Sequence, residues 1–227
     1  MPRPGIPRIV AVMSDSLRAS NGLRRAAETM HAVRDRCVWT QRIGHDDLVP
    51  YLQEEAAELV DAIEMGTRDD LKEELGDLLW QVLFHAEIAS RDERDPFDID
   101  DVADALSDKM IRRHPHVFAD AVATTPEEVL VHWNAAKAAE KRTRTSVLDG
   151  VSTHMPSLAL AQKVLGKAAQ VEVSAAPASP DPTSEAELGD ALLALVALAR
   201  SEGWDAERAL RQRLRALADE VRAAESS

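Results

Sequence analysis

The chain has 227 residues, with 27 Lys and Arg against 40 Asp and Glu, so its formal net charge is -13. This acidic balance argues against binding to a nucleic-acid polymer or an anionic membrane, because phosphate groups attract basic surfaces. Hydrophobic residues make up 45% of the chain but aromatic residues only 4%, which favours a helical core over a β-sandwich.

Helical periodicity runs through most of the sequence, and no segment alternates convincingly as a strand would. In chain order, helices are predicted at residues 22–35, 46–65, 69–91, 99–113, 126–141, 156–170, 184–201 and 205–223. Pro115 ends the fourth of these helices, because the residue before a proline avoids helical geometry. The proline- and serine-rich stretch 174–183 is predicted to be a flexible linker. The sequence therefore predicts an all-α fold.

Cysteine content and hydropathy indicate the compartment. The single cysteine, Cys37, excludes an intrachain disulfide. The longest wholly apolar run, residues 191–199, has nine residues. A membrane span needs roughly 20. We therefore expect a cytoplasmic protein with no membrane partner.

Two pairs of acidic residues lie at helical spacing on the second and third predicted helices. Glu55 falls on the apolar stripe of its helix, and Glu58 lies three residues further along, on the same surface. Glu74 and Asp77 repeat this spacing on the next helix. A turn at residues 65–67 allows the two helices to pack as an antiparallel hairpin, which would bring the two pairs opposite each other.

Four carboxylates beside an apolar core repel one another and lose solvation, and a hard divalent cation relieves both costs. A ligand set made only of oxygen favours Mg²⁺, or Mn²⁺, over zinc. The alternative is a pair of solvated acidic faces, the usual state of glutamates on helices. The paired spacing on two adjacent helices favours the metal site.

Two further polar residues, Gln81 and His85, continue a narrow ladder along the otherwise apolar part of the third predicted helix. We expect His85 to be a hydrogen-bonded core histidine. Di-iron bundles use Glu-x-x-His pairs, and no glutamate of the hairpin has a histidine three residues on, so iron is disfavoured.

A small basic segment, Lys109, Arg112 and Arg113, stands at the end of the fourth predicted helix. Cations are favoured at a helix C-terminus, which explains one or two of these residues, but all three together could neutralise a polyphosphate. Further on, Trp133 and Lys137 share one helix face. Spacing alone leaves open whether Trp133 stacks on a nucleobase or belongs to the core.

The tetrad Glu74–Asp77 recurs as Glu187–Asp190, 113 residues later. An apolar helix follows both copies, and each then leads into another helix that begins with acidic residues. This arrangement favours a duplicated unit over coincidence in a chain rich in Leu, Ala and Glu.

These motifs together resemble the MazG family of nucleoside triphosphate pyrophosphohydrolases. The resemblance covers most of residues 23–145. It rests on Cys37-Val-Trp39, where the family usually has Cys-Pro-Trp, on Glu54-Glu55-x-x-Glu58, Glu74-Leu-Gly-Asp77, Ser107-Asp-Lys109 and Arg112-Arg-His-Pro-His-Val-Phe118, and on Trp133…Lys137…Glu140-Lys141.

The resemblance implies an all-α fold whose chains dimerise so that their helices form four-helix bundles. It also implies hydrolysis of NTPs and dNTPs to the monophosphate and pyrophosphate with Mg²⁺, in control or sanitation of the nucleotide pool. The implied metal ligands are Glu55, Glu58, Glu74 and Asp77. Glu54 is our choice for the general base. The implied substrate-binding residues are Lys109, Arg112, Arg113, Trp133 and Lys137.

The predicted organisation has four parts. They are a flexible N-terminus (1–21), a MazG-like catalytic domain (22–145), a connecting helix and linker (146–183) and degenerate MazG-like C-terminal helices (184–227). The second copy keeps Glu187 and Asp190, but no Glu-Glu-x-x-Glu segment precedes them. We therefore expect this half-domain not to hold Mg²⁺ in the same way.

The substrate is left open by a departure upstream. The family pattern Trp-Asp-x-x-Gln-Thr-His is reduced here to Trp39 and His45, without the Asp, Gln and Thr. The alternatives to a general NTP pyrophosphohydrolase are a specialist for dUTP, dCTP or a damaged nucleotide, and a non-catalytic helical dimerisation or regulatory module.

Overall fold

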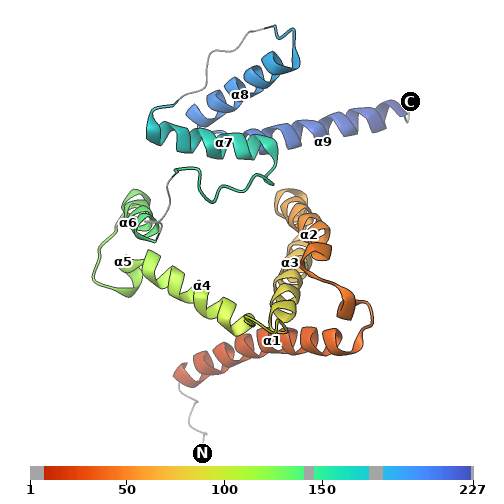
Figure 1. Cartoon of the computed structure of the whole chain (residues 1–227), viewed down its shortest axis with the longest axis vertical. Helices are drawn as coiled ribbons and strands as arrows, with labels where there is room; N and C mark the ends of the chain where they lie inside the picture. Colours follow the sequence, from red (N-terminus) through yellow and green to blue (C-terminus); the bar gives the residue numbers. More distant parts are fainter. Residues whose placement is uncertain (1–7, 141–145, 174–180, 226–227) are drawn as a thin grey trace, which may run out of the picture. The chain divides into compact units, whose positions relative to one another are not determined.

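The structure, a computed structural model, describes residues 8–140, 146–173 and 181–225, with side chains described from residue 22 to residue 220 within these ranges (Figure 1). Every regular element in this part of the chain is helical, which confirms the predicted all-α fold. The chain forms two compact units, Met1–Lys137 and Ala138–Ser227, called here the N-terminal and C-terminal units.

The elements follow the predicted helices closely. In order they are α1 (Arg8–Arg36), η1 (Thr40–Arg42), α2 (His45–Met65), α3 (Arg68–Ala89), α4 (Ile99–Arg113), α5 (Pro115–Phe118), α6 (Pro126–Ala139), α7 (Ser157–Ala168), η2 (Ala169–Val171), α8 (Glu185–Ser201) and α9 (Ala206–Glu225). Apart from the start of α1, the predicted boundaries of these longer helices agree with the structure within two residues. The short elements η1 and α5 were not predicted.

The start of α1 differs from the prediction. The helix begins at Arg8, so residues 8–21, which were predicted to be flexible, are helical. The predicted start, Gly22, lies inside the helix, where glycine costs only about 1 kcal/mol relative to alanine, too little to end it. Residues 1–7 and the stretch 174–180 of the predicted linker lie outside the described residues.

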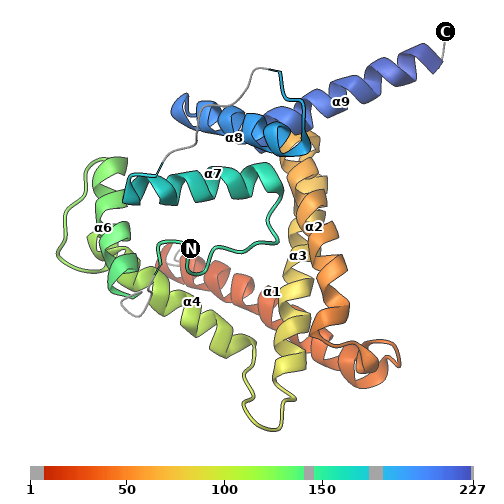
Figure 2. The ribbon, with the colours of Figure 1, turned by 45° about the horizontal axis from the view of Figure 1, so that its top comes forward.

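Helices α2 and α3 pack side by side as the predicted antiparallel hairpin (Figure 2). Gly66 closes the end of α2 with a hydrogen bond from its N–H to the carbonyl of Ala62 (3.0 Å), and a Cβ at Gly66 would lie only 2.7 Å from that oxygen. Thr67 then caps α3. Its hydroxyl accepts from the N–H of Asp70 (3.2 Å), and the Asp70 carboxylate accepts from the N–H of Thr67 (2.7 Å).

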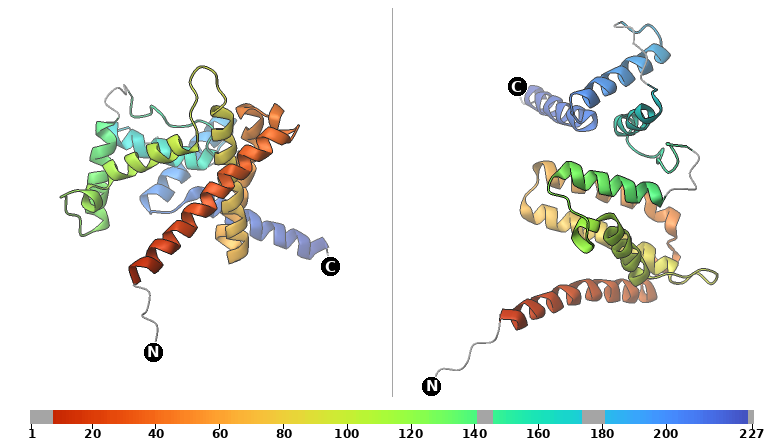
Figure 3. Two further views of the ribbon diagram at one scale, coloured as in Figure 1. Left: turned by 90° about the horizontal axis from the view of Figure 1, so that it is seen from below. Right: turned by 90° about the vertical axis from the view of Figure 1, so that its left-hand side faces the viewer.

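The core of the N-terminal unit lies where α1 crosses the hairpin (Figure 3). Met30 of α1, Leu48 of α2, and Leu83 and Phe84 of α3 are buried there. These α3 residues lie nine and ten positions beyond Glu74, which is roughly 15 Å at 1.5 Å per residue. The core therefore fixes one half of the hairpin and leaves the carboxylates near its turn.

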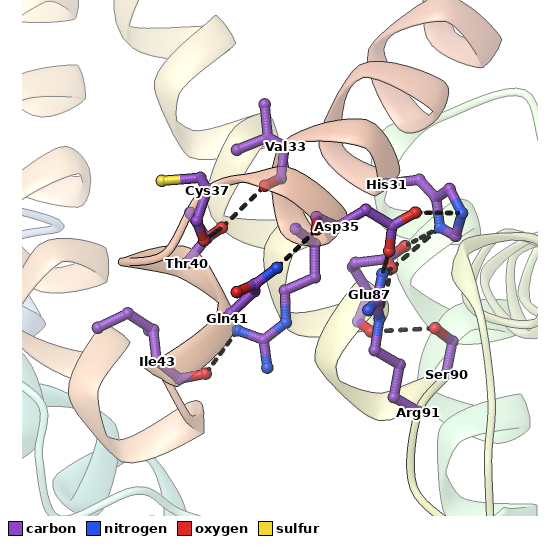
Figure 4. Close-up of polar contacts among 11 residues, drawn as sticks. His31, Val33, Asp35, Cys37, Thr40, Gln41, Ile43, Glu87, Ser90 and Arg91 are labelled. Atoms are coloured by element: carbon purple, nitrogen blue, oxygen red, sulfur yellow. Dashed lines mark hydrogen bonds and ion pairs between the residues drawn. The ribbon is translucent and has the colours of Figure 1, made fainter.

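Charged contacts hold the end of α1 against the end of α3 (Figure 4). Arg91 donates to Asp35 of α1 (2.7 Å) and to Glu87 of α3 (2.5 Å). His31 contacts the same Glu87 carboxylate (3.1 Å). Glu87 is only 12% exposed, so this network replaces solvation that the carboxylate loses.

In the C-terminal unit, α7 packs against α8 and α9. Gly203, with a φ of 72°, forms the left-handed turn after α8. The side chain of Gln162 on α7 then bridges the start of α9, because it donates to the carbonyl of Trp204 (2.9 Å) and accepts from the N–H of Ala206 (3.1 Å). In the described part of the chain, no helix is both long and apolar enough to cross a membrane.

Candidate metal centre

Three of the predicted ligands converge in the hairpin. Glu55 and Glu58 of α2 and Glu74 of α3 each place a carboxylate oxygen so that all three atoms lie within 4.8 Å of one another. Glu58 is exposed, whereas Glu55 and Glu74 are half-buried. The spacing of three residues along α2 and the packing of α2 on α3 together produce this cluster.

The electrostatics of the cluster are unfavourable without a cation. Burial raises the pKa of Glu55 above its ordinary value, and the charges of Asp77 and Glu58 raise it further. Burial, followed by Glu58 and Asp77, likewise raises the pKa of Glu74. One oxygen of Glu74, Oε2, is buried without a hydrogen-bond partner. Ionised carboxylates in such a position need a compensating positive charge.

Asp77 and Glu54 lie at the margin of the cluster. Asp77 is exposed and close enough for its charge to act on both half-buried glutamates, but it is not one of the three residues whose oxygens converge. Glu54 is also exposed, and its charge contributes to the raised pKa of Glu55. The structure therefore brings three predicted ligands together and leaves the fourth beside them.

The residues present fit a hard divalent cation. All three donors are carboxylates, the ligand type that suits Mg²⁺ and Mn²⁺. An ion at this point would neutralise the mutual repulsion and give the unpartnered Glu74 oxygen a ligand. The cluster also borders a shallow surface hollow lined by Glu58, Ala62, Gly66, Asp70 and Glu74, among others, so it is open to solvent on that side.

The polar ladder of α3 continues from the cluster into the core. Gln81 is buried, and a side-chain hydrogen bond from it opposes the rise in the pKa of Glu55. His85, one turn on, lies 2.8 Å from His45 between Nδ1 atoms, and the two rings are stacked. Burial lowers the pKa of His85 and favours its neutral form. His85 is thus hydrogen-bonded, as predicted, but no sequence pattern pointed to its partner, His45 of α2.

The basic segment forms a separate group. Arg113 lies over the ring of Trp133, 4.9 Å from the ring centroid, and His114 meets the same ring edge-on at 5.3 Å. Lys109 and Lys137 are half-buried on α4 and α6. The C-terminal end of α4, together with α6, lies away from the α2–α3 hairpin (Figures 1 and 2). The ribbon thus separates the C-terminal end of α4, which carries the basic segment, from the hairpin that carries the carboxylates.

The second tetrad occupies a different position in its helix. Glu187 is the third residue of α8, whereas Glu74 is the seventh of α3. The Glu187 carboxylate accepts from the N–H (2.7 Å) and the hydroxyl (2.9 Å) of Thr183, and these bonds lower its pKa. This carboxylate therefore takes part in helix capping. The degenerate half-domain stays a prediction, which this contact supports.

Fold and cluster together define a helical protein whose α2–α3 hairpin carries a carboxylate site suited to a divalent cation. The family model of the MazG nucleotide pyrophosphohydrolase domain matches residues 43–118. This segment contains all four predicted metal ligands and the basic residues of α4, but not Trp133 or Lys137.

Three relatives extend the comparison. An uncharacterized 26.1 kDa protein of Streptomyces cacaoi is 46% identical over 198 residues, which cover 87% of this chain and 80% of that protein. The nucleoside triphosphate pyrophosphohydrolase of Escherichia coli K12 is 37% identical over 219 residues, which cover 85% of this chain and 82% of that protein. The protein of the same name from Mycobacterium tuberculosis is 50% identical over 143 residues, which cover 63% of this chain and 43% of that protein. The chain belongs to the MazG family of nucleotide pyrophosphohydrolases.

Proposed function

We propose that this protein hydrolyses nucleoside triphosphates, ribo and deoxy, to the monophosphate and pyrophosphate. The convergence of Glu55, Glu58 and Glu74 within 4.8 Å carries the proposal, because this cluster is suited to the cation that such a reaction needs. Asp77 is proposed as the fourth ligand, since its charge already acts on Glu55 and Glu74. The ion is proposed to be Mg²⁺, with Mn²⁺ as a substitute.

In the proposed reaction, water attacks the α-phosphorus, and the bond to the bridging oxygen breaks so that pyrophosphate leaves. The bound cation would polarise the phosphate and share the charge of the leaving group. Glu54, exposed beside Glu55, is proposed to orient the water and accept its proton. Lys109, Arg112 and Arg113 are proposed to bind the triphosphate oxygens. Trp133 and Lys137 are proposed to contact the nucleoside.

A homodimer is proposed as the active form. The C-terminal end of α4, which carries the basic segment, lies apart from the hairpin in the ribbon, and a second copy would bring the two to one nucleotide. The hairpin also exposes large apolar side chains, including Ile63, Met65 and Leu75, which are each more than half exposed. Exposed apolar surface of this kind is typical of an interface. A cytoplasmic location is also proposed, because the nucleotide pool on which such an enzyme acts lies there.

Product analysis tests the proposed reaction. The purified protein is incubated with a panel of NTPs and dNTPs and Mg²⁺, with and without EDTA. We expect monophosphate and pyrophosphate, and no turnover in EDTA. Glu58→Gln should abolish turnover with the helical content kept, while Asp104→Asn, an exposed carboxylate on α4, should leave it unchanged. Diphosphate and orthophosphate, or full activity of Glu58→Gln, would exclude the proposed mechanism.

Mixing inactive variants tests the proposed dimer. Glu58→Gln and the double variant Lys109→Ala, Arg112→Ala are each expected to be inactive. If the two halves of a site come from different copies, a mixture that exchanges subunits regains part of the activity. A protein that sediments as a monomer at full activity, or a mixture that stays inactive despite exchange, would rule out this arrangement.

A further inference from the structure

Gln81 is a buried amide that packing alone does not explain. It is 4% exposed, and Thr40 is the other buried polar residue in the described part of the chain. The Thr40 hydroxyl lies against two carbonyl oxygens, those of Val33 (3.0 Å) and Cys37 (3.1 Å). In contrast, Oε1 of Gln81 has no hydrogen-bond partner in the structure. Burying an unpaired amide oxygen is unfavourable, so an apolar side chain of similar shape would suit this position better if packing were its only role.

The position of Gln81 directs it at the carboxylate cluster. Seven residues separate it from Glu74, which is close to two full turns, so both lie on the same face of α3. The Gln81 side chain opposes the rise in the pKa of Glu55, so it lies close to that carboxylate across the hairpin and favours its ionised form. An ionised carboxylate only accepts hydrogen bonds, so the amide N–H is the donor. Gln81 therefore joins the buried part of α3 to one of the three converging carboxylates.

His85 does not share this role. It lies one turn deeper along α3 and is held by His45, 2.8 Å away, at the start of α2. Gln81 thus stands between the histidine pair and the cluster, and it is the buried member of the ladder that touches a carboxylate of the cluster.

We propose that Gln81 is a positioning residue of the metal site, whose amide N–H orients the Glu55 carboxylate toward Glu58 and Glu74 and so strengthens cation binding. The inference rests on the proposed function. Residues that hydrogen-bond to a metal ligand fix its orientation, and their loss commonly weakens metal binding by about 10- to 100-fold.

Binding of Mn²⁺ alone, measured by calorimetry on the full chain without nucleotide, tests the proposal. Gln81→Met keeps the length of the side chain and removes the donor, while Gln81→Asn keeps the amide but withdraws it by one methylene. Both variants are expected to bind Mn²⁺ about tenfold more weakly than the wild type. Leu83→Val, a change in the buried core two residues away on α3, is the matched control and should keep wild-type affinity. Circular dichroism in EDTA reports the helical content of each variant.

The outcomes separate the two proposals. Wild-type affinity in Gln81→Met or in Gln81→Asn, with helical content retained, overturns the role of Gln81 and leaves the metal site standing. An equal loss in Leu83→Val also overturns it, because the effect would then follow from core packing. A wild-type chain that binds no Mn²⁺ removes the metal site itself, and both proposals fall together.

Discussion

Glu58 on α2 and Glu74 on α3 face each other across the hairpin with carboxylate oxygens within 4.8 Å. After burial, the charge of Glu58 is the largest cause of the raised pKa of Glu74. The packing of α2 on α3 thus forces together two groups that repel each other when ionised. The arrangement lowers the stability of the metal-free chain, and a bound cation would reverse the effect.

Glu74→Gln should therefore separate stability from function. Because the variant removes one buried charge, its melting temperature in EDTA is expected to exceed that of the wild type. Added Mn²⁺ should raise the melting temperature of the wild type and not that of the variant. Turnover should fall at least about 100-fold, the upper range for losing a residue that only supports a ligand.

Differential scanning fluorimetry with and without Mn²⁺ measures both melting effects. Asp104→Asn removes an exposed carboxylate of α4 and serves as the control, with wild-type behaviour expected in each condition. A lower melting temperature of Glu74→Gln in EDTA would show that the carboxylate stabilises the metal-free fold, contrary to the repulsion inferred from its surroundings.

The stability gained in Glu74→Gln should depend on pH in a defined direction. The pKa of Glu74 is raised above its ordinary 4.5 in the folded chain, so the folded chain binds the proton more tightly than the unfolded chain does. The penalty for the charge is thus complete above the raised pKa and disappears as the pH falls to about 4.5. Urea denaturation in EDTA from neutral pH down to about 5 should show the difference between variant and wild type shrinking. A difference that grows on acidification would contradict this.

Acidification should also weaken the fold through His85. Burial, and then the charge of His45, lower the pKa of His85 from its ordinary 6.5, so the unfolded chain takes up this proton first. The stability due to neutral His85 is present above about pH 6.5 and is lost as the pH falls toward the lowered pKa. NMR titration of the His85 ring should give a midpoint below 6.5. A midpoint above this value would contradict the burial of the His85 ring.

Arg91 should tie α1 to α3 through charge. Arg91→Leu removes the bonds to Asp35 and Glu87 and leaves the buried side of Glu87 without its cation. We expect a modest loss in the free energy of unfolding that becomes smaller at high salt, since Arg91 is partly exposed and screened. Urea denaturation at low and high salt measures it. Arg94→Leu, in the exposed loop that follows, is the control and should change little.

Gln162 should hold the start of α9 in the C-terminal unit. Gln162→Leu removes the bonds to the Trp204 carbonyl and the Ala206 N–H, at an expected cost of about 0.5–1.5 kcal/mol, because water can reach this contact. Amide hydrogen exchange should accelerate around Ala206. Gln212→Leu, an exposed glutamine on α9, should leave exchange there unchanged. Equal protection in both variants would show that the bridge contributes nothing.

Local features of the hairpin could be predicted from the sequence. A repeat of about 3.6 residues marks each helix, and the Gly66-Thr67 turn joins α2 to α3, because a short connection makes neighbouring helices antiparallel. The three-residue spacing of Glu55 and Glu58 then places both on one side of α2. These are properties of short segments, for which local geometry is enough.

Contacts between distant segments could not be predicted from the sequence. The sequence predicted both Asp77 and Glu74 as metal ligands. The packing of α3 against α2 leaves Asp77 outside the group of three converging carboxylates. No sequence pattern indicated that His45 would face His85 or that Gln81 would reach Glu55, because each pair joins positions at least 26 residues apart.

The amino-acid sequence by itself determined an all-helical protein of the MazG family with a carboxylate-bearing hairpin, because helical period, turn chemistry and motif spacing are encoded locally. Only the tertiary structure decided which carboxylates meet and that the C-terminal end of α4 lies apart from the hairpin that carries them. Those relationships depend on where the core of Met30, Leu48 and Phe84 fixes α1 on the hairpin and on the direction in which α4 leaves α3. Packing of side chains from distant segments sets the position of α1 and the direction of α4, and no local sequence pattern predicts that packing.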